Sequence, residues 1–498
     1  MSAARFHIYR IPYSIRSRTN ESYWVHAFLD SRNLLIAALL AAVSCLCISY
    51  PGNLYSDSYG RIELAMQLPD IIRGAFGGSP AGISSWNTVT PCYFIALFHA
   101  LTGNIAAYTF AQAFFFFYST LLLIRKMTAR YRVLSYLLYL LNPLFFCVSI
   151  YHETGIGVVI GLVSLILLLN LDGRDFGPGD TVMAGLLILL AAFVAFGYRA
   201  NTFTVLPALL LILFLRKELP FIRRILYTGC LTGGLLLTVL IPKILRIDTM
   251  SSVSLGFVWE MGENIASMPD EKQEQYKDWL DGLFGEGATG RLCDWAGCPD
   301  DDGEGQARPI RRVASFSWEV ADFSREAISE AGLGRIFGRY LALYARSPAS
   351  SIRTKLAFAG YALGIHPGLH LKEWEYDRWE RGKEFGMSDS RMRHRFTRAY
   401  RIAVEKTCIP LRPWLVLLIA LLLVFLKIKA TGQSLRQSIE CQLILISVFY
   451  YGAFLLNTQS MEFRYFYPAF YLLSLTVISS ITALLPLPAR TEPHRGRP

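Results

Sequence analysis

The strongest constraint on this chain is a series of long apolar segments separated by short polar turns. Of its 498 residues, 53% are hydrophobic and only 17% are charged, whereas a soluble domain usually carries about 25% charged residues. A helix needs about 20 mainly apolar residues to cross a bilayer, and several segments approach that length. The sequence therefore predicts an all-α polytopic membrane protein that is surrounded by membrane lipid.

Ten membrane spans account for the apolar pattern, with both termini in the cytoplasm. The predicted spans are 33–50, 104–124, 133–150, 155–171, 181–198, 202–215, 225–244, 411–426, 438–456 and 467–485. The resulting organisation is a cytoplasmic tail (1–32), an N-terminal transmembrane module (33–244) with a first outer loop (51–103), a large extracytoplasmic segment (245–410), C-terminal transmembrane helices (411–485) and a second cytoplasmic tail (486–498). The large segment is expected to be mainly helical.

Two stretches of the first outer loop have helical sequence but are too short to cross a bilayer. They cover residues 61–68 and 91–101. Short amphipathic helices of this kind lie along the membrane surface. We therefore expect interfacial helices in the first outer loop.

The net charge of +11 is explained by topology. Basic residues cluster in segments between spans that fall on one side of the predicted layout, as the positive-inside rule requires. Nucleic acid is therefore not an expected partner.

Two cysteines lie close together in a polar part of the chain. Cys293 and Cys298 flank a polar turn in the large extracytoplasmic segment, where an oxidising compartment allows a short-loop disulfide. Two free thiols are the alternative. Zinc would need more ligands than this pair supplies.

Ionisable side chains gather at the predicted outer ends of the spans. These residues are Asp57, His152, Glu153, Arg199, Glu462 and Arg464. A carboxylate can act as a general base, and guanidinium groups bind phosphate through their planar fork of donors. Together these groups can support transfer from a lipid-phosphate donor, provided that the outer ends converge.

Each residue also has a simpler interpretation. Asp57 can cap a helix, and His152 with Glu153 can belong to a solvated turn. Arg199 and Asn201 can satisfy backbone groups at a helix end. Glu462 and Arg464 can pair or face water, and Tyr465 lies where interfacial aromatic residues are common.

Several short motifs occur in a familiar order. They are Tyr50-Pro51-Gly52, Asp57-Ser58, Trp86, Pro91, Asn142-Pro143, Arg199 with Asn201, and Glu462-Phe463-Arg464-Tyr465-Phe466-Tyr467-Pro468. In this arrangement the chain resembles the multi-pass glycosyltransferases of the GT-C superfamily, and in particular bacterial members that use polyprenyl-phosphate-linked sugars. The likeness covers most of the membrane part and little of residues 245–410.

The resemblance implies a reaction and a site. Asp57 would be the catalytic base, and the donor phosphate would be held by Arg199 and Arg464. Further substrate contacts would come from His152, Glu153, Asn201, Glu462 and Tyr465. The two glutamates would orient the cations or hold a divalent metal, which some members of the superfamily need and others do not.

The chain departs from the family pattern at two places. It has Thr88 and Thr90 where relatives often have a histidine, and His152-Glu153 where they often have a lysine and an aspartate. The resemblance implies inverting sugar transfer at the periplasmic face of a bacterial inner membrane. The acceptor would be a cell-envelope glycan, lipid or protein.

Two other functions compete with this hypothesis. An O-antigen-type polymerase or ligase would depend on arginines of a large outer loop. A lipid-linked sugar transporter or flippase would place charges or broken helices near the middle of the membrane. The predicted spans are nearly free of charge, which favours chemistry at one membrane face.

Overall fold

We describe the protein from a computed structural model. The residues it describes are 32–48, 50–52, 56–77, 83–85, 88–128, 132–141, 153–171, 176–249, 252–287, 330–365, 412–456 and 463–485, together with 328, 391, 395 and 398. In these ranges the regular structure is helical apart from two strands of three residues each.

Each of the ten predicted spans overlaps an apolar helical segment, although of the span 133–150 only residues up to 141 are described. The helical segments are α2 (Arg32–Ile48), α5 (Ala106–Met127), α6 (Arg132–Leu141), α7 (Glu153–Leu169), α8 (Pro178–Tyr198), η2 (Ala200–Val205) with α9 (Leu206–Leu215), α10 (Phe221–Ile244), α20 (Pro413–Thr431), α21 (Ile439–Leu456) and α22 (Phe463–Leu484). Among the described residues, 6 helices are long and apolar enough to span a bilayer, namely α5, α8, α10, α20, α21 and α22. The chain is therefore a helical membrane protein, and the count of ten spans stays a prediction.

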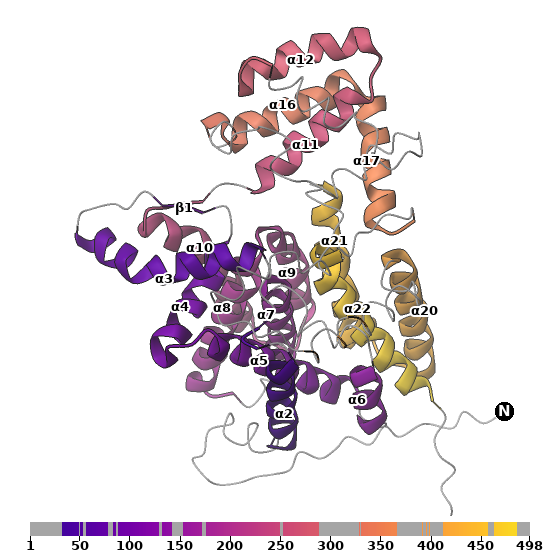
Figure 1. Cartoon of the computed structure of the whole chain (residues 1–498). Helices are drawn as coiled ribbons and strands as arrows, with labels where there is room; N and C mark the ends of the chain where they lie inside the picture. The colour runs from indigo at the N-terminus through magenta and orange to yellow at the C-terminus, as the bar shows by residue number, and fades with distance from the viewer. Residues whose placement is uncertain are drawn as a thin grey trace, which may run out of the picture.

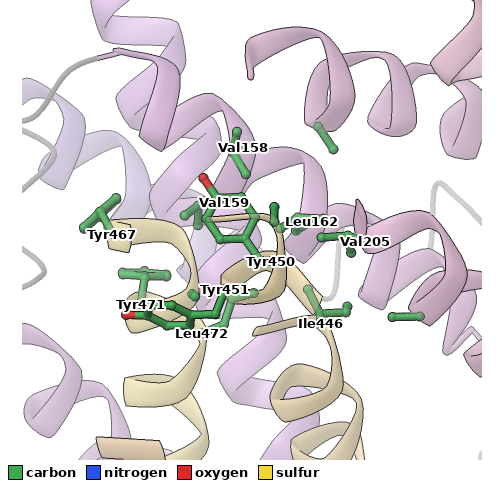
Figure 2. Packing of buried hydrophobic residues seen from close by; sticks show 14 of the residues in the cluster. Val158, Val159, Leu162, Val205, Ile446, Tyr450, Tyr451, Tyr467, Tyr471 and Leu472 are labelled. Carbon is green, nitrogen blue, oxygen red and sulfur yellow. The ribbon is translucent and has the colours of Figure 1, made fainter. Parts of the chain in front are cut away.

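Helix α7 lies at the centre of the apolar core. It packs against α5, α8 and α22, and Val158, Val159 and Leu162 on it are completely buried. Figure 2 shows these three side chains around Tyr450 of α21. Outward-facing leucines such as Leu236 on α10 remain exposed, as expected for helices that contact lipid.

A polar network joins α20, α21 and α22 at the ends that the predicted topology places inside. Lys427 forms a buried ion pair with Glu440, whose carboxylate also accepts hydrogen bonds from Ser438 (2.9 Å) and Ser479 (2.6 Å). A buried charge is tolerated only when it is paired and hydrogen-bonded, so this cluster fixes the three helix ends together.

The first outer loop contains both expected helices, in longer form. They are α3 (Ser56–Gly77), which continues through an internal proline, and α4 (Thr90–Thr102). Strand β1 (Ile83–Ser85) pairs in parallel with β2 (Ile247–Thr249), which follows α10. This pairing was not predicted, because three-residue strands carry no readable alternation. In Figure 1, α3 runs crosswise over the ends of the membrane helices.

Four further helices form what we call the outer helical unit. They are α11 (Ser252–Ala266), α12 (Asp270–Phe284), α16 (Leu333–Arg346) and α17 (Pro348–Ala362). Figure 1 shows the unit beyond one end of the apolar helices. It contacts that end through α11 on η2 and through α17 on α21, so it is attached to the segment that follows α8 and to α21.

Candidate functional site

The Tyr-Pro-Gly motif that follows α2 is held against the start of α5. Asn104 donates a hydrogen bond to the Tyr50 hydroxyl at 2.8 Å, and the Tyr50–Pro51 peptide is cis. Gly52 has a φ of +149°, and a Cβ there would lie 2.6 Å from Oγ1 of Thr109. Glycine is therefore required both by the backbone and by the close approach, and the motif packs against the start of α5.

Asp57 lies in the first turn of α3, which begins at Ser56. It therefore lies at the start of the helix. Its neighbours Ser58, Tyr59 and Arg61 are buried, so this turn packs into the protein. The Asp57 side chain itself is outside the described residues, and its role as a base stays a prediction.

Arg199 connects the end of α8 to the beginning of α7. Its backbone is extended between α8 and η2, and its Nε donates a hydrogen bond to Oγ1 of Thr154 at 3.3 Å. Thr154 is buried and directly follows Glu153, the first residue of α7. The end of α8 and the start of α7 are therefore in contact through these two side chains.

The first outer loop joins the same place through Tyr198. Thr88 donates a hydrogen bond to the carbonyl oxygen of Tyr198 at 3.0 Å, and the hydroxyls of Tyr198 and Tyr108 are 3.1 Å apart. Gln112 extends this chain by donating to Tyr108 at 3.3 Å. Thr88 therefore ties the segment just before α4 to the end of α8.

A glycine allows the first outer loop to approach α8 closely. A Cβ added at Gly197 would lie 2.2 Å from Oγ1 of Thr90, which is impossible without displacement of α4.

We expect Gly197→Ala to destabilise the protein by about 1–3 kcal/mol, as overpacking of a tight interface does, and to separate Thr88 from Tyr198. Thermal unfolding in detergent measures the loss. Gly229→Ala on α10 is the matched control, because a Cβ there meets nothing within 4 Å; an equal loss in both variants would contradict the prediction.

Asn201 is a buried residue of η2, the short helix that follows α8. The carbonyl oxygen of Asn201 accepts a hydrogen bond from Thr204 (3.0 Å), whose hydroxyl is also 3.1 Å from the carbonyl oxygen of Phe449 on α21. The buried hydroxyl of Thr202 has no hydrogen-bond partner among the described residues. Segment η2 therefore places polar groups between α8 and α21.

The remaining predicted site residues are described by backbone only or not at all. Glu153 begins α7, and Arg464 and Tyr465 lie in the first turn of α22; these two helices pack together. The side chains of those three residues, and the whole of His152, Glu462, Cys293 and Cys298, are outside the described residues.

A divalent ion would need ligands that the described part of the chain does not bring together. In that part, no group of three His, Cys, Asp or Glu residues is placed to hold a metal ion. The side chains of the two glutamates suggested as ligands, Glu153 and Glu462, are not among those described. The metal therefore stays a prediction that rests on the resemblance.

Sequence reasoning missed a buried charge cluster between the outer helical unit and α21. Glu260 of α11 pairs with Lys355 of α17 at 2.5 Å and accepts hydrogen bonds from Tyr340 (3.1 Å) and Tyr344 (2.6 Å). Lys355 also donates to the carbonyl oxygen of Leu456 at 2.9 Å. That carbonyl ends α21, where backbone acceptors lack helical partners.

Burial and neighbouring charge shift the pKa values of Lys355, Tyr340 and Tyr344 in this cluster. Burial lowers the pKa of Lys355, and the Glu260 carboxylate opposes that effect. Burial and the same carboxylate raise the pKa of both tyrosine hydroxyls, Tyr340 and Tyr344. Both tyrosines are thus kept as neutral donors to Glu260. The sequence signal was two glutamates, Glu260 and Glu263, within an otherwise apolar helix.

The described site is thus the junction of four segments at one end of the bundle: the end of the first outer loop, the start of α7, the turn after α8, and η2. Its contacts are those of Thr88 with Tyr198 and of Arg199 with Thr154. No protein-family model, curated protein or solved structure matches the chain.

Proposed function

We propose that the protein is an integral-membrane glycosyltransferase of the bacterial inner membrane. It would move a sugar from a polyprenyl-phosphate donor to a cell-envelope acceptor at the outer face, with inversion. The observation that supports this most is the hydrogen bond from Arg199 to Thr154, because it brings a phosphate-binding side chain to the start of α7. The contact of Thr88 with Tyr198 brings the loop of Asp57 to the same junction.

The proposed reaction needs one base and one group of cations. Asp57 takes the proton from the acceptor hydroxyl, and the acceptor oxygen forms a bond to the anomeric carbon. The bond between that carbon and the phosphate oxygen breaks, and its electron pair leaves with the polyprenyl phosphate. Arg199 and Arg464, with His152 as a third cation, stabilise the phosphate charge as it develops.

The charges of the described membrane helices favour this proposal over a transporter. Lys427 lies in the last turns of α20 and Glu440 in the first turn of α21, and the two neutralise each other. A transport pathway would place ionisable groups near the middle of the spans. The polymerase or ligase alternative depends on arginines of the large outer segment, so it predicts that transfer survives substitution of Asp57.

The proposal is tested by transfer from a panel of polyprenyl-phosphate sugars to envelope acceptors, with the full chain in lipid nanodiscs. We expect Arg199→Gln to lower kcat/KM by about 100-fold, because one donor to the developing phosphate charge is removed. Lys217→Gln removes an exposed charge at the opposite end of the bundle and should leave the rate unchanged. Absence of transfer from every donor by the wild type, or full activity of Arg199→Gln, would refute the proposal.

A further inference from the structure

Three arginines form a ridge on one face of α16, in the outer helical unit. Arg335, Arg339 and Arg346 are spaced by four and seven positions, which places their side chains on one side of a helix. Arg335 and Arg346 are exposed and Arg339 is half-buried. Over eleven residues the helix rises about 16 Å, so the ridge is longer than one sugar ring.

A tryptophan of α12 holds two of these guanidinium groups. The Cζ atoms of Arg339 and Arg346 lie 4.6 Å and 5.1 Å from the centroid of the Trp279 ring. Both are within the range of cation–π attraction. Stacking on a rigid ring restricts the two long side chains before any ligand arrives, which lowers the entropy cost of binding.

No carboxylate of a described residue forms a salt bridge with any of the three arginines. Two acidic residues of α12 have partners elsewhere: Glu274 pairs with Lys277 at 3.0 Å, and Asp281 accepts the backbone amide of Gly287 at 2.6 Å. Asp278, beside Trp279, is exposed. Like charges that meet at one ring repel each other. An anion between them would remove that repulsion and use their planar donors bidentately.

The position of the ridge in the fold indicates which kind of anionic partner can reach it. Helices α12 and α16 lie beyond one end of the apolar helices (Figure 1). A soluble polyanion reaches this face more readily than a membrane surface does. The length of the ridge favours a linear chain with several charges.

We propose that Arg335, Arg339 and Arg346, ordered by Trp279, bind an anionic glycan chain whose sugars carry carboxylate or phosphate groups. As a glycan acceptor site this rests on the proposed glycosyltransferase function and names the acceptor class. As a binding site it stands on the described contacts alone. Charge–charge attraction at an exposed ridge is screened by salt, so binding is strongest at low ionic strength.

The test is binding of fluorescent polygalacturonate, with neutral dextran as the comparison, to the full chain in phosphatidylcholine nanodiscs. The wild type should bind polygalacturonate and not dextran. The Arg339→Gln/Arg346→Gln double variant should bind it at least about tenfold more weakly, because glutamine cannot replace the charged, bidentate guanidinium groups. Single Arg346→Gln should weaken binding, whereas Arg353→Gln, an exposed arginine on α17, should not.

Several outcomes would overturn this inference: no binding by the wild type, equal binding of dextran, or equal losses of affinity in Arg346→Gln and Arg353→Gln. An Arg339→Lys/Arg346→Lys variant keeps the charge without the planar forks, so its affinity should fall between those of the wild type and the glutamine double variant. Binding that depends on the ridge without transfer from any donor would refute the glycosyltransferase proposal alone. If sugar is transferred to an anionic glycan at a rate that these substitutions do not change, the proposed binding role of the ridge alone would be refuted.

Discussion

Asp57→Asn is expected to reduce sugar transfer by about 10²- to 10⁴-fold, the usual contribution of a general base. Asparagine keeps the size and the hydrogen-bonding ability of aspartate and is tolerated at helix starts. It cannot accept the proton of the acceptor hydroxyl. The loss should therefore appear in the rate of transfer measured in nanodiscs, with little change in thermal stability.

Asp70→Asn is the matched control for this variant. Asp70 lies on the same helix, α3, and forms a highly exposed pair with Arg73, where an ion pair contributes at most about 1 kcal/mol. The two substitutions remove the same charge, but only one removes the proposed base. Near-normal transfer by Asp57→Asn would reduce Asp57 to a residue that stabilises the start of α3 and would favour the polymerase or ligase alternative.

The membrane helices were predictable because their cause is local. Each apolar segment must satisfy its own backbone hydrogen bonds in lipid, so hydropathy alone located α5, α8, α10 and α21. Residues 202–215 were predicted as one span, and the structure divides them between η2 and α9. The large segment was expected to be mainly helical, and α12 is one of the helices found in it.

The contacts that build the site were not predictable in the same way. The bonds of Thr88 to Tyr198 and of Arg199 to Thr154 join residues distant in sequence, and no local pattern encodes such a pairing. The assignment of these helix ends to the outer face stays a prediction, and their expected convergence is seen for Arg199 and the start of α7. The convergence stays a prediction for the side chains of Asp57 and Arg464.

The Glu260–Lys355 pair shows a second limit of sequence reasoning. Residues 245–410 form one mixed-charge segment in which solvated charges are the ordinary expectation. In the structure Glu260 is 1% exposed, because the hydroxyls of Tyr340 and Tyr344 and the ammonium group of Lys355 replace its water. A charged residue inside an apolar helix was the available signal for such a pair.

Lys355→Met is expected to destabilise the attachment of the outer helical unit by about 3–5 kcal/mol, the cost of removing one partner of a buried ion pair. Lys355 is the only cation among the described residues that pairs with Glu260. Its removal leaves a buried carboxylate with two tyrosine donors and leaves the Leu456 carbonyl without its cation. Hydrogen exchange should accelerate at the end of α21 and in α11.

A double variant separates charge from packing in this prediction. Glu260→Gln/Lys355→Met removes both charges, and glutamine can still accept from Tyr340 and Tyr344, so it should be more stable than Lys355→Met alone. Arg353 is exposed on α17, two positions before Lys355. Arg353→Met should therefore leave hydrogen exchange unchanged. A double variant no more stable than Lys355→Met would mean that poorer packing, and not the unpaired carboxylate, causes the damage. If instead the charges behave as expected, Lys355 fixes the outer helical unit to the end of α21, and its removal should also slow transfer without touching the reacting groups.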